Sequence, residues 1–208
     1  MRRLILFIYL LMSFTISVNS ANRREESVTD MQKLGMALDY FTANKYHEAL
    51  IIFIQLDKKY KLNYRFKAYI GICYYYEWQY AEACKYLDEA IPHLDAYSPD
   101  ERSVYYNIAA ESHFELKEYV KAIPLYEKRF VVCKNREKGD ALYRLGFCYM
   151  FLEKWANAAE YFKSAEAYYT KYSHEDSRIN MRQLNNMING CEEKQNNSQT
   201  NLSEVLRE

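Results

Sequence analysis

The segment EWQYAEACKYLDEAI, residues 77–91, predicts a helix that packs closely against another helix. Its residues Ala83, Leu87 and Ala90 recur at intervals of four and three positions, so they lie on one helical face. A face that combines alanine with a larger apolar residue lets a neighbouring helix come near. The segment alone does not identify that neighbour.

Three other segments have the same pattern, and together they indicate a repeat. They are NKYHEALIIFIQL (44–56), KEYVKAIPLYEKRF (117–130) and EKWANAAEYFKSA (153–165). Each places an aromatic residue three positions before an alanine and a bulky apolar residue four positions after it. The alanines, which are 34, 39 and 36 residues apart, are Ala49, Ala83, Ala122 and Ala158. The first interval is the period of a known helix-turn-helix repeat.

A second series of small residues precedes these alanines at the same intervals. Its members are Ala37, Gly71, Ala110 and Gly146. Small side chains let two helix backbones touch, so each member is expected to mark the point where the first helix of a pair crosses the second.

Residues 29–170 resemble the tetratricopeptide repeat family through these small residues. The fourth copy matches the family pattern at Leu145, Gly146, Tyr149, Ala158, Phe162 and Ala165. The departures are Ala37 and Ala110 in place of the usual glycine, His113 in place of a common tyrosine, and Arg129 in place of a small residue. The resemblance implies an all-α fold, a right-handed superhelical array of helix-turn-helix hairpins.

The repeats are expected at about 29–62, 63–96, 102–135 and 138–171, with first helices near 29–43, 64–76, 103–115 and 139–151. Residues 92–101 predict a longer loop between repeats. A capping helix is expected at 174–193, with Gly190 near its end, because a terminal repeat needs a cover for its apolar face. The polar residues 194–208 predict a flexible tail.

The N-terminus has the order of an export signal. Arg2 and Arg3 precede an apolar run at 4–18, and small residues stand before Ala21. We therefore expect a signal peptide at 1–20, a linker at 21–28, and a protein exported to the periplasm or cell envelope of a bacterium. The alternative is an uncleaved anchor, although the run is shorter than the roughly 20 residues that usually span a bilayer.

Composition excludes several classes of protein. Lys+Arg and Asp+Glu both number 28 in 208 residues, so the chain has no charge excess suited to nucleic acid. The odd number of cysteines, five, does not suit a disulfide framework, and the spacings are not those of a metal site. We expect the cysteines to be small buried apolar residues.

The sequence contains no nucleophile elbow, phosphate-binding glycine loop, zinc-protease motif or dinucleotide fingerprint. The histidines are scattered over different predicted helices and loops: His47, His93, His113 and His174. We therefore expect no catalytic residue, no cofactor and no metal. An enzyme would require polar groups from several helices to converge at one site. The sequence does not place such groups together.

The predicted functional surface is the concave wall formed by the first helices. Residues one and four positions after each crossing residue should point into this groove, and most of them are apolar or aromatic. With their neighbours, the predicted partner-binding residues are Leu38, Phe41, Tyr69, Ile72, Tyr75, Tyr76, Phe114, Tyr143, Phe147, Met150 and Phe151. The alternative is that tight winding or the capping helix buries part of this wall.

These features favour a non-enzymatic scaffold that holds an apolar segment of another protein or peptide, for example in envelope assembly or transport. The alternative is a sensory or regulatory peptide-binding module of the envelope. Arg144 is the main basic residue of the wall, so capture of a carboxylate is not expected. No nucleic acid or small-molecule substrate is expected, and the membrane would be contacted only through an uncleaved signal segment.

Overall fold

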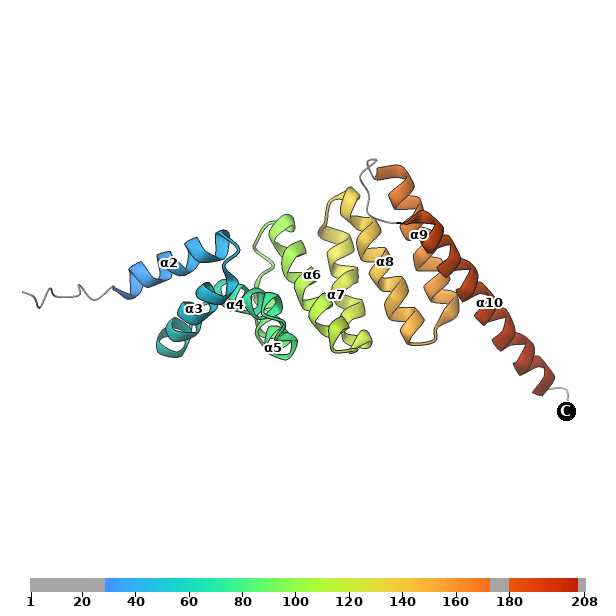
Figure 1. The fold of residues 1–208 in the computed structure, drawn as a ribbon, viewed down its shortest axis with the longest axis horizontal. Coiled ribbons are helices and arrows are strands. Elements are labelled where there is room, and N and C mark those ends of the chain that lie inside the picture. Colours follow the sequence, from blue (N-terminus) through green and yellow to red (C-terminus); the bar gives the residue numbers. More distant parts are fainter. Residues whose placement is uncertain (1–28, 173–179, 206–208) are drawn as a thin grey trace, which may run out of the picture.

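The structure is a computed structural model that describes residues 29–172 and 180–205. The described residues form nine α-helices and one short 3-10 helix, Ile91–His93 (Figure 1). The α-helices are α2 (Asp30–Thr42), α3 (Tyr46–Tyr60), α4 (Tyr64–Tyr76), α5 (Tyr80–Ala90), α6 (Pro99–Glu115), α7 (Tyr119–Val132), α8 (Asn135–Phe151), α9 (Trp155–Tyr172) and α10 (Met181–Val205). The all-α expectation is confirmed. The predicted signal peptide and linker lie outside the described residues.

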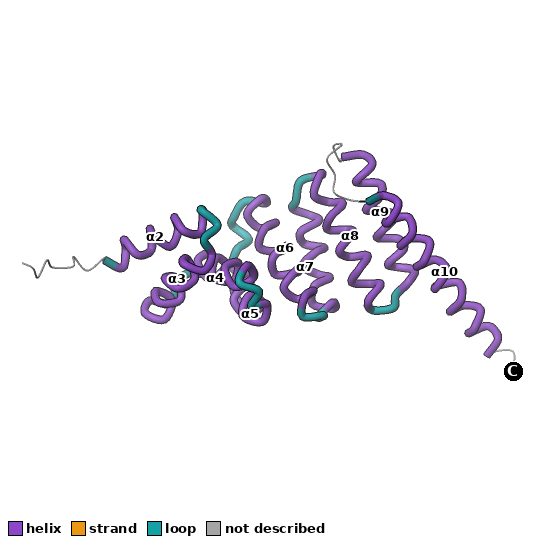
Figure 2. Tube along the Cα trace, viewed as in Figure 1, coloured by secondary structure: helices purple, strands orange, loops and turns teal. Residues whose placement is uncertain are grey.

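The helices form antiparallel pairs that stack in chain order. The pairs are α2–α3, α4–α5, α6–α7 and α8–α9, and α10 packs on α9. Most contacts join a helix to the next one along the chain, with an additional contact between α4 and α6. The result is an elongated array rather than a closed bundle (Figure 2). Such an array buries its apolar faces only by stacking.

The turn inside each pair has the same backbone conformation. Its second residue has a positive φ of 58–61° in every copy, and the four residues are Asn44, Trp78, Lys117 and Glu153. They are 34, 39 and 36 residues apart, the same intervals as the alanines. In each turn the next backbone N–H donates to a carbonyl five residues earlier, for example from Gln79 to Tyr74 at 2.9 Å. The predicted repeat is therefore confirmed in the backbone.

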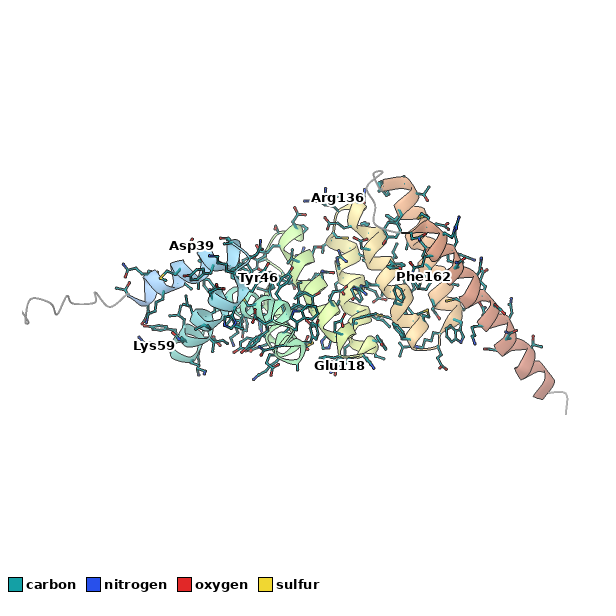
Figure 3. The ribbon with its side chains drawn as sticks, viewed as in Figure 1. Asp39, Tyr46, Lys59, Glu118, Arg136 and Phe162 are labelled. Carbon is teal, nitrogen blue, oxygen red and sulfur yellow. The ribbon has the colours of Figure 1, made fainter. Side chains whose placement is uncertain are left out.

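The crossing points are as close as the small residues suggest. A Cβ added to Gly71 would lie 2.6 Å from Leu87 Cγ and 3.3 Å from the Ala83 carbonyl oxygen. A Cβ added to Gly146 would lie 2.5 Å from Phe162 Cδ1, and Figure 3 shows Phe162 inside the array. Side chains larger than hydrogen do not fit there unless the facing side chains of Leu87 and Phe162 move.

Side-chain caps fix where several helices begin. Thr29 and Gln32 form a reciprocal capping box at the start of α2, with the Thr29 N–H donating to Gln32 Oε1 at 2.8 Å. Ser98 Oγ accepts a hydrogen bond from the Glu101 N–H at 3.2 Å, and Pro99 occupies the first turn of α6. Helix α6 therefore starts within the predicted loop at 92–101, four residues earlier than expected. Helix α8 also starts earlier, at Asn135.

The C-terminal helix differs from the expectation. Helix α10 continues through Gly190 and reaches Val205, so the stretch 194–205 is helical and was wrongly expected to be a flexible tail. Leu184, Ile188 and Cys191 are buried at intervals of four and three residues and pack into the main core. This apolar stripe holds α10 on the array. The polar residues that follow extend the helix, because adding a residue to an existing helix is easier than starting a new one. The expected cap residues 174–179 lie outside the described residues.

Two clusters of buried apolar residues hold the array together. The smaller joins α2, α3 and α4 around Phe53, and the larger runs from Ala68 in α4 to Cys191 in α10. All five cysteines are buried, as expected, and all five have free thiols. None of the helices at 29–172 and 180–205 combines the length and apolar character that a membrane span needs.

Candidate functional site

The eleven predicted partner-binding residues all lie on α2, α4, α6 and α8, the first helices of the four pairs. Ile72 is only 4% exposed and belongs to the larger core, because α4 packs directly on α6 at this face. It therefore does not line an open surface. Tyr76 and Phe151 are the most accessible, at 45% and 48%.

The other eight residues are partly buried and pack against the two cores. They are Leu38, Phe41, Tyr69, Tyr75, Phe114, Tyr143, Phe147 and Met150. Phe147 rests on the buried Phe162 with ring centroids 5.4 Å apart, and the Tyr143 hydroxyl approaches Met187 Sδ of α10 at 3.9 Å. The capping helix thus covers part of the predicted wall, as the alternative interpretation supposed.

The accessible aromatic residues gather where the first helices end and the turns begin. Tyr75, Tyr76, Trp78 and Tyr80 surround the α4–α5 turn and line a pocket of about 340 Å³ together with Glu115 of α6. Trp78 is 79% exposed at the positive-φ position of its turn. The ring of Tyr76 is supported from behind by Tyr46, which stacks on it at 4.1 Å. Burial raises the pKa of Tyr46 and of Tyr75 to about 12, so both hydroxyls stay neutral.

A second aromatic group surrounds the next two turns. Tyr119 stacks on Phe151 at 4.9 Å, and Phe114 meets Phe151 edge-on at 5.9 Å. The turns that carry these residues, α6–α7 and α8–α9, lie on the lower side of the array in Figure 2. Leu116 and Val120, both exposed, belong to the same stretch of surface.

We call this surface the turn edge. It is defined by the exposed residues Tyr76, Trp78, Leu116, Val120 and Phe151. Its two halves are continuous, because Glu115 lines the Tyr75–Tyr80 pocket and the neighbouring Phe114 contacts Phe151. Exposed aromatic and aliphatic side chains grouped in this way are typical of a protein-binding surface.

A buried ion pair lies behind the turn edge. Glu111 is 7% exposed, and its carboxylate accepts hydrogen bonds from Arg144 Nη2 at 2.6 Å and from the Tyr126 hydroxyl at 2.9 Å. The Arg144 guanidinium also lies 4.8 Å from the ring centroid of Phe114. The pairing with Glu111 offsets the charge of Arg144 within the array. Burial, followed by the nearby Glu111 charge, raises the pKa of Tyr126.

Sequence reasoning missed part of this surface. Tyr119 was expected only as the aromatic residue of the repeat pattern, and Trp78 was given no role, yet Trp78 is the most exposed aromatic residue in the described part of the chain. The alignment of the four copies does contain a signal that points to Trp78. The turn position holds Asn44, Lys117 or Glu153 in the other copies, and a tryptophan among such polar residues has no packing reason.

Comparison with known proteins agrees with this architecture. Residues 140–171 match the model of the tetratricopeptide repeat. No curated protein matches the chain by sequence. Among solved structures, a MamA protein is similar with a TM-score of 0.62 and 16% identity, over 80% of this chain and 82% of that one.

Two further structures show the same likeness in fold. The apo form of RapI has a TM-score of 0.60 and 18% identity, over 83% of this chain and 66% of that one. A putative kinesin light chain from Podospora anserina, with nearly identical TPR-like repeats, has a TM-score of 0.56 and 13% identity, over 86% and 96%. The chain thus has the fold of a TPR-like array of helix pairs, and its residues 140–171 match the tetratricopeptide repeat model.

Proposed function

We propose that this protein is a non-enzymatic scaffold that binds an apolar segment of a partner protein along the turn edge. The observation that carries the proposal is the exposure of Trp78, Tyr76 and Phe151 in a continuous stretch of surface. Tetratricopeptide-type arrays bind other proteins or peptides, and the accessible apolar residues here are gathered at one edge. The predicted wall contributes to the site through its accessible ends at Tyr76 and Phe151.

The energetic argument rests on the aromatic side chains. Aromatic rings offer a large contact area and lose little conformational entropy when they are bound. Tyr76 and Phe151 are already held by their stacking partners Tyr46 and Tyr119. A partner that covers them gains contact area without the cost of ordering flexible side chains.

The decisive test is the double variant Trp78→Ser with Phe151→Ser. Both side chains are accessible, so the variant should have a melting temperature close to that of the parent. It should no longer capture the partner proteins that the parent captures. Val131→Ser, at an exposed valine on the far end of α7, is the matched control and should capture partners normally. Undiminished capture by the double variant would contradict the proposal.

A different pair of substitutions separates the turn edge from the buried wall. Tyr75→Ser with Phe147→Ser removes partly buried rings, of which Phe147 packs on Phe162. We expect this variant to lose stability together with binding. If it lost binding and kept full stability, the functional surface would be the wall rather than its edge.

Export to a bacterial envelope belongs to the same proposal, and its support is the order of residues at 1–21 alone. A scaffold there would hold its partner during assembly or transport. Mass spectrometry of the N-terminus of the native protein tests this step. A mature chain that starts near Ala21 supports export, and an intact Met1 in the cytoplasmic fraction excludes it.

A further inference from the structure

A second cluster of functional groups lies where the second and third helix pairs meet. It consists of Cys84 of α5, His113 of α6 and Glu118 at the start of α7, with Asp88 one turn after Cys84. One ligand atom from each of Cys84, His113 and Glu118 lies within 4.8 Å of the others. Thiol, imidazole and carboxylate are the three side-chain groups that bind Zn²⁺.

The imidazole is fixed by a carboxylate on each side. His113 Nδ1 lies 2.6 Å from Glu118 Oε2, and Nε2 lies 3.1 Å from Asp88 Oδ1. The other Glu118 oxygen accepts a hydrogen bond from Lys121 Nζ at 2.9 Å, so this carboxylate is also oriented. A metal-binding histidine generally gives its second N–H to a carboxylate, and Asp88 is placed to receive it.

Burial and access also suit a bound ion. The side chain of His113 is only 3% exposed and Cys84 is buried, whereas the Asp88 and Glu118 side chains are 50% and 37% exposed. The inner ligands are therefore shielded, and the outer carboxylates leave a path from solvent. Figure 3 shows Glu118 at the lower side of the array, near the turn edge.

We propose that Cys84 Sγ, His113 Nδ1 and the Glu118 carboxylate bind one Zn²⁺ ion, with Asp88 as the hydrogen-bond partner of His113 Nε2. The ion joins α5 to α6 and α7 and so locks the second pair against the third. A water molecule from the solvent side completes a tetrahedral site.

Zn²⁺ binds cysteine as the thiolate and histidine as the neutral imidazole, so its binding competes with protons at these two ligands.

The test uses the full, reduced chain after treatment with a chelator. Titration with Zn²⁺ should give one ion per chain, and Co²⁺ should give a thiolate-to-cobalt absorption band. Cys84→Ala should abolish that band. Asp88→Asn should weaken Zn²⁺ binding by about 10–100-fold, and Glu118→Gln by at least as much.

Two variants serve as matched controls. His47 faces Glu77 at 2.9 Å on the surface with no thiol in its cluster, and Cys133 is a buried cysteine elsewhere. His47→Ala and Cys133→Ala should bind Zn²⁺ like the parent, and circular dichroism should show that all variants keep their helices. The proposal is overturned if the parent binds no stoichiometric Zn²⁺, or if Cys84→Ala and Glu118→Gln bind it with unchanged affinity.

Discussion

The first and the fourth helix pairs share a turn conformation, but their outer sides are covered differently. Helix α2 buries a single residue, Ala37, and a pocket of about 350 Å³ between α2 and α3 is lined by Leu34, Leu56 and other apolar residues. Helix α8 buries six residues, and α10 covers the fourth pair with Leu184 and Ile188. Among residues 29–172 and 180–205, no further helix packs on the outer side of the first pair, whereas α10 caps the fourth pair.

This difference shows that a repeated sequence determines a repeated backbone without giving each copy the same packing around it. A pair is stabilised by its own crossing and by the pairs on either side of it. The first pair has a neighbour on one side within the described residues, and its core is the smaller of the two clusters. We therefore expect local stability to rise from α2 towards the fourth pair.

The largest effect is expected from Gly146→Leu in the fourth pair. The added side chain would overlap Phe162, whose ring lies 2.5 Å from the position of a Cβ at residue 146. Overpacking of this kind should cost about 3 kcal/mol or more of the free energy of unfolding. Chemical denaturation measures this change in the free energy of unfolding. A midpoint equal to that of the parent would show that the crossing is not close.

Leu184→Ala tests the cap itself. Leu184 is fully buried where α10 packs on the array, so the cavity left by truncation should cost about 3 kcal/mol. Asn185→Ala, at the exposed neighbour, is the control and should change stability little. If both variants melted alike, α10 would not be a structural part of the capped end.

Hydrogen exchange can test the gradient of stability directly. Backbone amides of α2 should exchange at least about tenfold faster than those of α8, which corresponds to about 1.4 kcal/mol of local opening free energy. Exchange followed by mass spectrometry of the native protein resolves the two helices. Equal protection of α2 and α8 would mean that the open end is as stable as the capped end.

The smallest effect is expected from Gly35→Ala in α2. No atom lies within 4 Å of a Cβ at this position, so the substitution should stabilise the helix by about 0.5–1 kcal/mol through backbone entropy. Gly190→Ala in α10 has equally free space and is the counterpart at the capped end. If α2 unfolds locally while the rest of the array stays folded, Gly35→Ala should slow hydrogen exchange in α2. The melting temperature of the whole protein should then be unchanged.

The sequence predicted the repeat because its spacing is local and regular. Gly71 and Ala83 meet as their interval indicated, and Gly146 faces Phe162 where α8 packs on α9. The positions of the helix ends were predicted less well. Ser98 caps α6, which starts at Pro99, four residues before the expected start, because a short capping signal within a loop resembles ordinary turn composition.

The candidate sites could be predicted only in part, because they depend on how neighbouring pairs pack. Ile72 fits the pattern of a wall residue but is covered where α4 meets α6. The cluster of Cys84 and His113 has no metal-site spacing in the sequence. Its members come from three helices, and only the stacking of the second pair on the third brings them together.

The positive-φ residue of each turn has a consequence for how such a protein can change. Its backbone conformation is fixed by the hydrogen bonds that end the preceding helix, and its side chain is exposed in all four copies. The chain accepts asparagine, tryptophan, lysine and glutamate there with the same geometry. A single substitution at this position can therefore add or remove a large exposed side chain such as Trp78 without disturbing the fold, so the outer surface of the turns can vary independently of the array that supports it.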